Sequence, residues 1–174
     1  MNVYATMQSP VGEMLLAGHQ AQAGRDSIAL TQVSMSGWRN APAVPGHWRL
    51  APSAFAEVTR QLTAYFAGHR CVFDLELAPA GTDFQQLVWR ALDAIPYGTT
   101  TTYGALAGQL GVPRGRIQAV GAAVGANPLA IIRPCHRVIG ADATMKGYAG
   151  GVERKQQLLA LEGAALPLLV FHDA

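Results

Sequence analysis

Cys135 and His136 are adjacent in the stretch LAIIRPCHRVIG, where they pair a potential nucleophile with a potential base. A cysteine reacts as its thiolate, and a nearby imidazole can take up the thiol proton. Pro134 keeps Arg133 out of the helical region. Because neighbouring side chains of a regular strand face opposite sides, cooperation between the pair requires a bend or a bridging water. The alternative interpretation is a buried, inert thiol, which is common for free cysteines.

Composition predicts a globular protein of one compact domain or two small ones. The chain has 174 residues, of which 50% are hydrophobic and only 14% are charged, which excludes a disordered chain. Residues 1–81 carry five arginines against five acids, whereas residues 82–174 carry eight Lys or Arg against six acids. The net charge of +2 therefore arises in the C-terminal half. This excess suits either an anion-facing surface or an ordinary solvated one.

Several classes of protein are not expected. No apolar stretch has the length of a membrane span, and the start of the chain does not resemble a signal segment. Two cysteines, Cys71 and Cys135, are too few for a disulfide scaffold or a structural zinc site. The histidines at 19, 47 and 69 are too widely spaced to suggest a metal site. We expect a cytoplasmic protein with free thiols, without a metal, a cofactor or a membrane partner.

Residues 1–76 predict a small α/β domain. A helix is expected over residues 53–68, with Ser53 as its N-cap and Gly68 at its end, because apolar residues recur at helical spacing. The rest of the domain is predicted as strands and a loop: a hairpin over residues 3–19, a strand over 26–35, a proline-rich loop over 37–52 and a closing strand over 71–79.

A linker over residues 77–81, containing Pro79 and Gly81, leads to a mainly helical domain over residues 82–174. Residues 82–95 predict an amphipathic helix capped by Thr82. Residues 100–111 and 112–127 predict two helices joined at Gly111, an arrangement shared by helix-turn-helix proteins and by plain helical hairpins.

The second helix of this pair contains the run QAVGAAVGAN, whose small side chains allow close approach to neighbouring protein or to a nucleic-acid groove. Packing against the core is the simpler interpretation for at least one face. Arg114 and Arg116 near the start of the helix would suit phosphates on the other.

The motifs resemble those of the O6-alkylguanine-DNA alkyltransferases, which repair DNA by direct reversal. The matching pieces are Asn127-Pro128, the Pro-Cys-His-Arg-Val run over 134–138, Tyr148 to Gly151, and the Leu-Glu-Gly run that contains Glu162. The likeness is close over residues 82–165 and only architectural over residues 1–76. It implies a ribonuclease H-like N-terminal domain and a winged-helix-like C-terminal domain.

This resemblance implies a chemistry for the Pro-Cys-His-Arg-Val run. Cys135 would attack the alkyl carbon on guanine O6, and on thymine O4, and would keep the alkyl group irreversibly, so that the protein acts once. His136 would serve as the base through a water, Glu162 would orient the imidazole, and Asn127 would hold the turn. Tyr103, Val138, Tyr148 and Ala149 would contact the flipped base. Ala149 stands where relatives often carry serine.

The resemblance also implies a monomer that binds the minor groove of double-stranded DNA without sequence preference. Ala119, Gly121 and Ala122 would permit the close approach of the helix. The family's base-replacing arginine falls on Gln118 here. Glutamine lacks the charge and the planar guanidinium, so either Arg114 or Arg116 compensates or base flipping is weaker in this protein.

Three other functions fit parts of the pattern. An alkyltransferase-like lesion sensor would share the fold, although such proteins lack the nucleophile that Cys135 provides. A cysteine hydrolase could use Cys135, His136 and Glu162, but such enzymes usually hold their base far away in sequence. A redox-sensing thiol would need a resolving partner, and no motif marks Cys71 as one.

Overall fold

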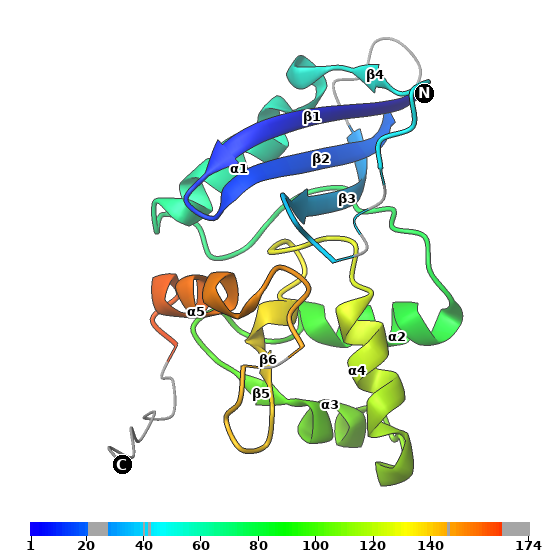
Figure 1. Cartoon of the computed structure of the whole chain (residues 1–174), viewed down its shortest axis with the longest axis vertical. Helices are drawn as coiled ribbons and strands as arrows, with labels where there is room; N and C mark the ends of the chain where they lie inside the picture. Colours follow the sequence, from blue (N-terminus) through cyan, green and yellow to red (C-terminus); the bar gives the residue numbers. More distant parts are fainter. Residues whose placement is uncertain (21–27, 40, 42, 146, 165–174) are drawn as a thin grey trace.

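The computed structural model describes residues 1–20, 28–39, 41, 43–145 and 147–164. Its N-terminal part is a sheet with strand order β3-β2-β1-β4, formed by β1 (Asn2–Ser9), β2 (Gly12–Gln20), β3 (Ile28–Met35) and the short β4 (Arg49–Leu50). The first three strands are antiparallel, and β4 pairs with β1 in parallel. Helix α1 (Ala56–Phe66) lies along one face of this sheet (Figure 1).

The predicted hairpin is confirmed by β1 and β2, which pair from Asn2 opposite His19 to Ser9 opposite Gly12. Gly12 has a φ of +104°, a conformation that glycine adopts without a steric penalty, so the turn is made where the sequence predicts it. The predicted strand over 26–35 is confirmed by β3 for its described residues. Residues 26 and 27, and residues 40 and 42 of the predicted loop, lie outside the described part of the chain.

Two local predictions for this part are wrong. Ser53 does not cap α1, because a 3-10 turn, η1 (Pro52–Phe55), precedes the helix and makes Phe55 its N-cap. Residues 71–79 do not form a strand and make one isolated bridge, between Leu77 and Leu30 of β3. The reason lies at the edge of β3. Its Leu30 bonds with the backbone of Glu76 and Ala78, whereas Val33 bonds with that of Pro128 and Ala130, so segment 71–79 pairs over only part of the strand.

The C-terminal part is mainly helical, as predicted. Helix α2 (Asp83–Asp93) begins with the predicted cap: Thr82 Oγ1 accepts from the Gln85 amide, and the Gln85 side chain accepts from the Thr82 amide. The remaining elements are β5 (Thr101–Thr102), α3 (Tyr103–Gln109), the turn η2 (Arg114–Arg116), α4 (Ile117–Gly125), the turn η3 (Cys135–Arg137), β6 (Val138–Ile139) and α5 (Val152–Leu161). Strands β5 and β6 pair in parallel.

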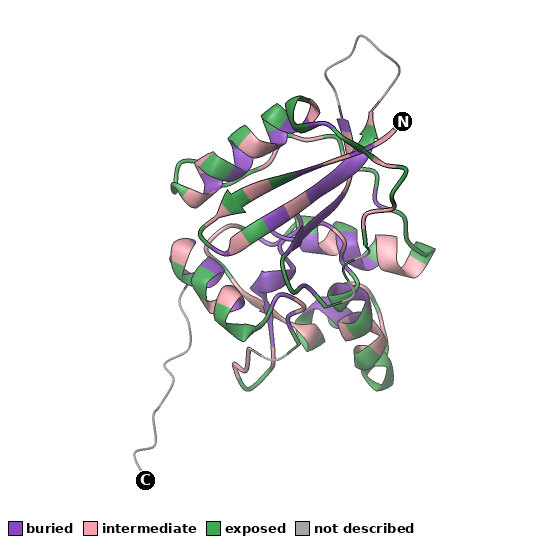
Figure 2. Cartoon of the chain, turned by 45° about the horizontal axis from the view of Figure 1, so that its top comes forward, coloured by how far each residue is buried: buried purple, intermediate pink, exposed green. Residues whose placement is uncertain are grey.

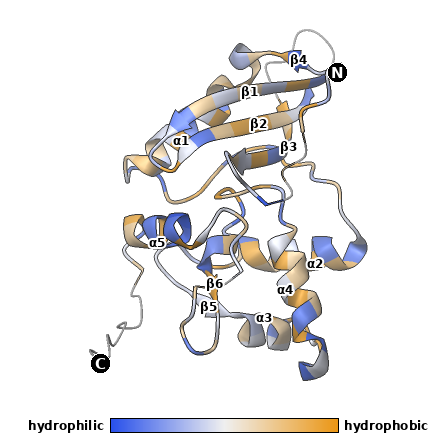
Figure 3. Cartoon of the chain, in the orientation of Figure 1, coloured by the Kyte–Doolittle hydropathy of each residue, from blue (hydrophilic) through white to orange (hydrophobic). Residues whose placement is uncertain are grey.

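Helices α3 and α4 form the predicted pair around Gly111, whose φ is +66°. Val120, Ala123 and Val124 bury one face of α4. Figure 3 shows that α4 is mostly hydrophobic, with hydrophilic residues at its N-terminal end. The second helix is shorter than predicted, because η2 takes up the residues before Ile117.

The two parts share one hydrophobic core. A single buried cluster joins strand residues such as Leu16 and Val33 with Leu92, Val120 and Leu129 of the helical part. Buried positions accordingly gather where the sheet faces the helices (Figure 2). The N-terminal sheet therefore supports the region that carries Cys135, and does not stand apart from it.

Of the described residues, no helix has the length and hydrophobicity needed to cross a membrane. Within the same residues, no three His, Cys, Asp or Glu side chains gather in a group that could hold a metal ion.

Candidate active site

The turn that carries Cys135 is held by the buried side chain of Asn127. Its Nδ2 donates to the carbonyl oxygens of Leu129 (3.3 Å) and Arg133 (3.0 Å), and its Oδ1 accepts from the Leu129 amide (3.1 Å). Between them, buried Ile131 has a φ of +69°, an unfavourable conformation for a β-branched residue, which costs about 1–3 kcal/mol. Three hydrogen bonds from one side chain thus hold a turn that its own sequence does not favour.

The N-terminal sheet fixes the same turn from outside. The Val33 amide donates to the Pro128 carbonyl (2.8 Å), and the Ala130 amide donates to the Val33 carbonyl (3.0 Å). These two bonds attach the residues before Cys135 to the edge of β3. Cys135 itself opens η3, directly after Pro134.

His136 and Glu162 form a buried pair. Nε2 of His136 lies 2.7 Å from Oε1 of Glu162, and both side chains are inaccessible to solvent. Because an ionised carboxylate can only accept, Nε2 carries the proton, and Nδ1 of the neutral ring holds the lone pair. Nδ1 is buried and has no hydrogen-bond partner among the described residues. Burial lowers the pKa of His136, so the ring is neutral and able to accept a proton.

Glu162 is held by four hydrogen bonds. Besides His136, its oxygens accept from Nε of Arg137 (2.8 Å), Nη2 of Arg137 (2.9 Å) and the hydroxyl of Tyr65 (2.7 Å). Burial alone would raise the pKa of Glu162, but the hydrogen bonds from His136, Arg137 and Tyr65 outweigh it and lower the pKa to about 2. Glu162 is therefore ionised at neutral pH and keeps the proton of His136 on Nε2.

Lys155 places a cation near the thiol. Its side chain is fully buried and reaches the carbonyl oxygen of Val138, 2.5 Å from Nζ. Burial raises the pKa of Cys135, while hydrogen bonding with Asn127 and the positive charge of Lys155 lower it in part. Burial also lowers the pKa of Lys155, to about 8. Lys155 is thus a buried ammonium group whose charge favours the Cys135 thiolate.

Cys135 lines a small cavity. The cavity has room for about one water molecule, roughly 10 Å³, and is lined by Trp38, Tyr103, Val124, Gly125, Cys135, Gly147, Tyr148 and Ala149. The structure therefore brings Tyr103, Tyr148 and Ala149 to the thiol. The Tyr148 hydroxyl is buried without a partner among the described residues. The predicted contact Val138 is not part of this lining; its side chain is buried in β6.

Three residues of this region were not singled out by their sequence. Trp38, from the loop after β3, contacts Tyr148 edge-to-face with a centroid distance of 5.2 Å. In the sequence, Tyr65 is indicated only as one of the apolar residues of a predicted amphipathic helix. Lys155 belongs to the run VERKQQ, which resembles an ordinary solvated helix. No local pattern marks any of them, because their partners come from distant segments.

The residues expected to face DNA lie in η2 and in α4. Arg114, Arg116, Gln118 and Ala122 are exposed, and Ala119 and Gly121 are half-buried. Gly121 is the point where α4 approaches Tyr103, since a Cβ placed on it would lie 3.8 Å from that ring. The exposed side of α4 thus leads to the cavity that contains Cys135.

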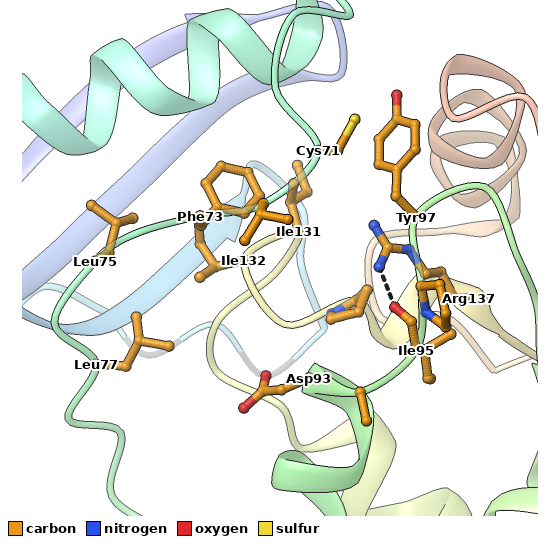
Figure 4. Close-up of a pocket in the computed structure, with 14 residues that line it drawn as sticks. Cys71, Phe73, Leu75, Leu77, Asp93, Ile95, Tyr97, Ile131, Ile132 and Arg137 are labelled. Atoms are coloured by element: carbon orange, nitrogen blue, oxygen red, sulfur yellow. Dashed lines mark hydrogen bonds between the residues drawn. The ribbon is translucent and has the colours of Figure 1, made fainter.

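Cys71 lies in a different pocket. This pocket, of about 340 Å³, is lined by Cys71, Tyr97 and Arg137 and by apolar side chains that include Phe73 and Leu75. Figure 4 shows Cys71 beside Tyr97, with Arg137 donating to the carbonyl oxygen of Ile95. Cys71 is exposed and Cys135 is buried, and the two thiols line separate pockets.

Fold and site together define a helix-turn-helix protein with a buried cysteine, which is followed in sequence by a histidine paired with a buried glutamate. Comparison with known protein families identifies the class more specifically. Residues 83–164 match the family model of the 6-O-methylguanine DNA methyltransferase DNA-binding domain, and residues 2–79 match that of its ribonuclease-like domain.

Individual relatives agree over nearly the whole chain. The methylated-DNA–protein-cysteine methyltransferase of Mycobacterium tuberculosis is 49% identical over 164 residues, which cover 94% of each chain. That of Methanosarcina acetivorans is 47% identical and covers 92% of this chain and 98% of its own. The crystal structure of M. tuberculosis OGT in complex with DNA aligns with a TM-score of 0.83 and 50% identity, over 91% of this chain and 92% of that one. The chain belongs to the 6-O-methylguanine DNA methyltransferase family.

Proposed function

We propose that this protein repairs DNA by transferring the alkyl group of O6-alkylguanine, and of O4-alkylthymine, to the sulfur of Cys135. The observation that carries the proposal is the position of the thiol. Cys135 lines a small cavity between α4 and Tyr148, and the next residue, His136, has an Nδ1 without a partner among the described residues. A family membership shared over nearly the whole chain supports the same chemistry.

The transfer is an in-line displacement at the alkyl carbon. The Cys135 sulfur forms a bond with that carbon while the bond between the carbon and guanine O6 breaks, and its electron pair remains on the purine. The thiol proton passes to Nδ1 of His136 through a bridging water. The purine anion takes up a proton from the hydroxyl of Tyr103 at the cavity wall, the proposed donor. The phenolate then regains a proton and the imidazolium of His136 releases one, both by exchange with water. The products are an S-alkyl cysteine and guanine.

The buried charges around the thiol assist this step. Glu162 holds the Nε2 proton of His136 and so leaves Nδ1 to accept. It also stabilises the imidazolium that forms when Nδ1 is protonated. The ammonium group of Lys155 favours the thiolate, whose formation burial opposes. A thioether is not hydrolysed under these conditions, so each protein molecule acts once.

Residues 82–174 form the proposed DNA-binding and transfer domain, which acts as a monomer in the cytoplasm. The exposed side of α4 enters the minor groove of double-stranded DNA, with Ala119, Gly121 and Ala122 allowing close approach, and the target base is flipped out of the stack. Val138 is proposed to contact this base through its backbone. Arg114 and Arg116 bind phosphates, so binding has no sequence preference and weakens as salt rises.

Mass spectrometry after incubation with a duplex that contains O6-methylguanine tests the proposal. We expect one methyl group per protein molecule, on the peptide that contains Cys135, and no further turnover on excess duplex. Cys135→Ser abolishes transfer but keeps DNA binding, whereas the matched variant Cys71→Ser transfers normally. Binding of the modified duplex without any methylated peptide would replace repair by lesion sensing, and repeated turnover would contradict the acceptor role of Cys135.

A further inference from the structure

Two cavities meet at the indole of Trp38. The first is the small cavity at Cys135, which holds about one water molecule. The second is a groove of about 260 Å³. It is lined by Gln32, Ser34, Trp38, Arg39, Gly125, Ala126, Asn127 and Pro128. Trp38 and Gly125 line both. Because Gly125 has no side chain, the indole of Trp38 is the side chain that lies between them.

The indole is held firmly in this position. Trp38 is only 9% exposed, and its ring meets that of Tyr148 edge-to-face at an interplanar angle of 83°. A Cβ placed on Gly150 would lie 2.8 Å from the Trp38 ring, so the backbone of Gly150 is in close contact with the indole. The Arg39 amide donates to the Ala149 carbonyl (3.0 Å) and fixes the chain next to Trp38. Rotation of the indole away from its position between the cavity and the groove would break these contacts.

We propose that Trp38 sets the upper size limit of the alkyl group that the protein accepts. This inference rests on the proposed function. A methyl group on guanine O6 needs little room beyond the sulfur, whereas an aromatic substituent such as benzyl must extend past the thiol. The indole blocks its extension toward the groove. Without the indole, the cavity and the groove join, and the benzyl ring gains a place to lie. Trp38 is thus a specificity-determining residue supplied by the N-terminal sheet region.

Competition between two substrates tests this role. Transfer rates are measured with two duplexes of the same sequence, one with O6-methylguanine and one with O6-benzylguanine, so that DNA binding contributes equally to both. The variants are Trp38→Ala, Trp38→Phe and the control Trp48→Ala, which removes a half-buried indole from the same loop, away from both cavities. The quantity compared is the ratio of the benzyl rate to the methyl rate, since the ratio cancels a general loss of active protein.

Trp38→Ala is expected to raise this ratio by about tenfold or more, the effect that a change of pocket size typically has on discrimination. Trp38→Phe, which keeps an aromatic ring and much of the packing, raises it less, and Trp48→Ala leaves it unchanged. An unchanged or lower ratio in both Trp38 variants, with wild-type transfer intact, would overturn this inference alone. A wild-type protein that transfers neither group would overturn the proposed function as well.

Discussion

The hydroxyl of Tyr65 donates a hydrogen bond of 2.7 Å to Oε1 of Glu162, a residue 97 positions further along the chain. Tyr65 belongs to α1, which packs on the N-terminal sheet, and Glu162 follows α5 at the end of the helical part. The same oxygen accepts from His136. The N-terminal part is therefore linked through one carboxylate to the base proposed for Cys135, in addition to its support of the turn after Asn127.

Removing the Tyr65 hydroxyl tests this link. Tyr65→Phe leaves Glu162 with one hydrogen bond fewer, so the free energy of unfolding should fall by about 1.5–3 kcal/mol, as for hydrogen bonds to charged groups. The transfer rate should fall several-fold, because Glu162 is less firmly held. Urea unfolding and single-turnover kinetics measure the two effects. Tyr97→Phe is the matched control, since the Tyr97 hydroxyl makes only a 3.5 Å contact with the Leu161 carbonyl.

Glu162→Gln should slow transfer by about a hundredfold, the usual magnitude of general-base assistance. A glutamine can offer its carbonyl oxygen to His136 but carries no charge to stabilise the imidazolium. In His136→Ala, the pH at which Cys135 becomes reactive should rise, because the thiol then loses its proton acceptor while burial keeps the pKa of Cys135 raised. Single-turnover rates from pH 6 to 10 report both effects. Profiles identical to wild type in both variants would contradict the assigned base.

The same carboxylate predicts acid sensitivity. Because the pKa of Glu162 is about 2 in the folded protein and ordinarily 4.5, its stabilisation is fully present above pH 4.5. It is lost as the pH falls through 2, and it amounts to something on the order of 3 kcal/mol. We expect the difference in unfolding free energy between wild type and Glu162→Gln to shrink over this range. A constant difference from pH 5 to pH 2 would show that Glu162 is not the group that titrates.

Lys155 predicts a second increase of stability with pH, in the alkaline range. Its pKa is about 8 when folded and 10.5 when free, so the unfolded chain binds more protons between these values. The contribution of Lys155 to stability should therefore rise from pH 8 to pH 10.5. This rise should be absent in Lys155→Met, which should also transfer more slowly at pH 7 because the Cys135 thiolate loses a nearby cation. Arg90→Met, which removes an exposed cation from α2, should change neither property.

Gln118→Arg concerns the exposed side of α4. Flipping a guanine out of the stack costs a few kcal/mol. An arginine would offset part of this cost, because it fills the vacated space with both charge and stacking surface. The variant should repair duplex DNA faster but react with free O6-benzylguanine at the wild-type rate. Gln109→Arg adds the same charge on α3 and serves as the control. If Gln118→Arg is no faster on duplex DNA, Arg116 becomes the next residue to test.

Features that depend on a few neighbouring residues were predictable from the sequence. The cap at Thr82, the turn at Gly12 and the turn at Gly111 depend on a local hydrogen bond or on a φ that glycine adopts easily, so the chain specifies them where they occur. The adjacency of Cys135 and His136 is likewise visible in the sequence, and so are the motifs that indicate the family.

The cap predicted at Ser53 and the strand predicted over residues 71–79 could not be judged from neighbouring residues alone. The start of α1 is decided by the 3-10 turn that Pro52 begins, and the pairing of segment 71–79 by competition with residues 128–130 for the edge of β3. The turn at Pro52 is local, but Ser53 is a possible cap by residue type, and only the backbone geometry shows that Phe55 takes this place. Residues 128–130 are far in sequence from segment 71–79, so local propensity and pattern cannot reveal their competition for β3.

The active site is divided in the same way. The sequence by itself determined which groups can react: a thiol, an imidazole and a carboxylate at Cys135, His136 and Glu162. Only the tertiary structure decided how they are controlled, because Tyr65, Lys155 and Trp38 acquire their roles through burial beside partners from distant segments. A buried charge or an aromatic wall acts through space, and its strength depends on distance and on the exclusion of water, which only the folded chain defines.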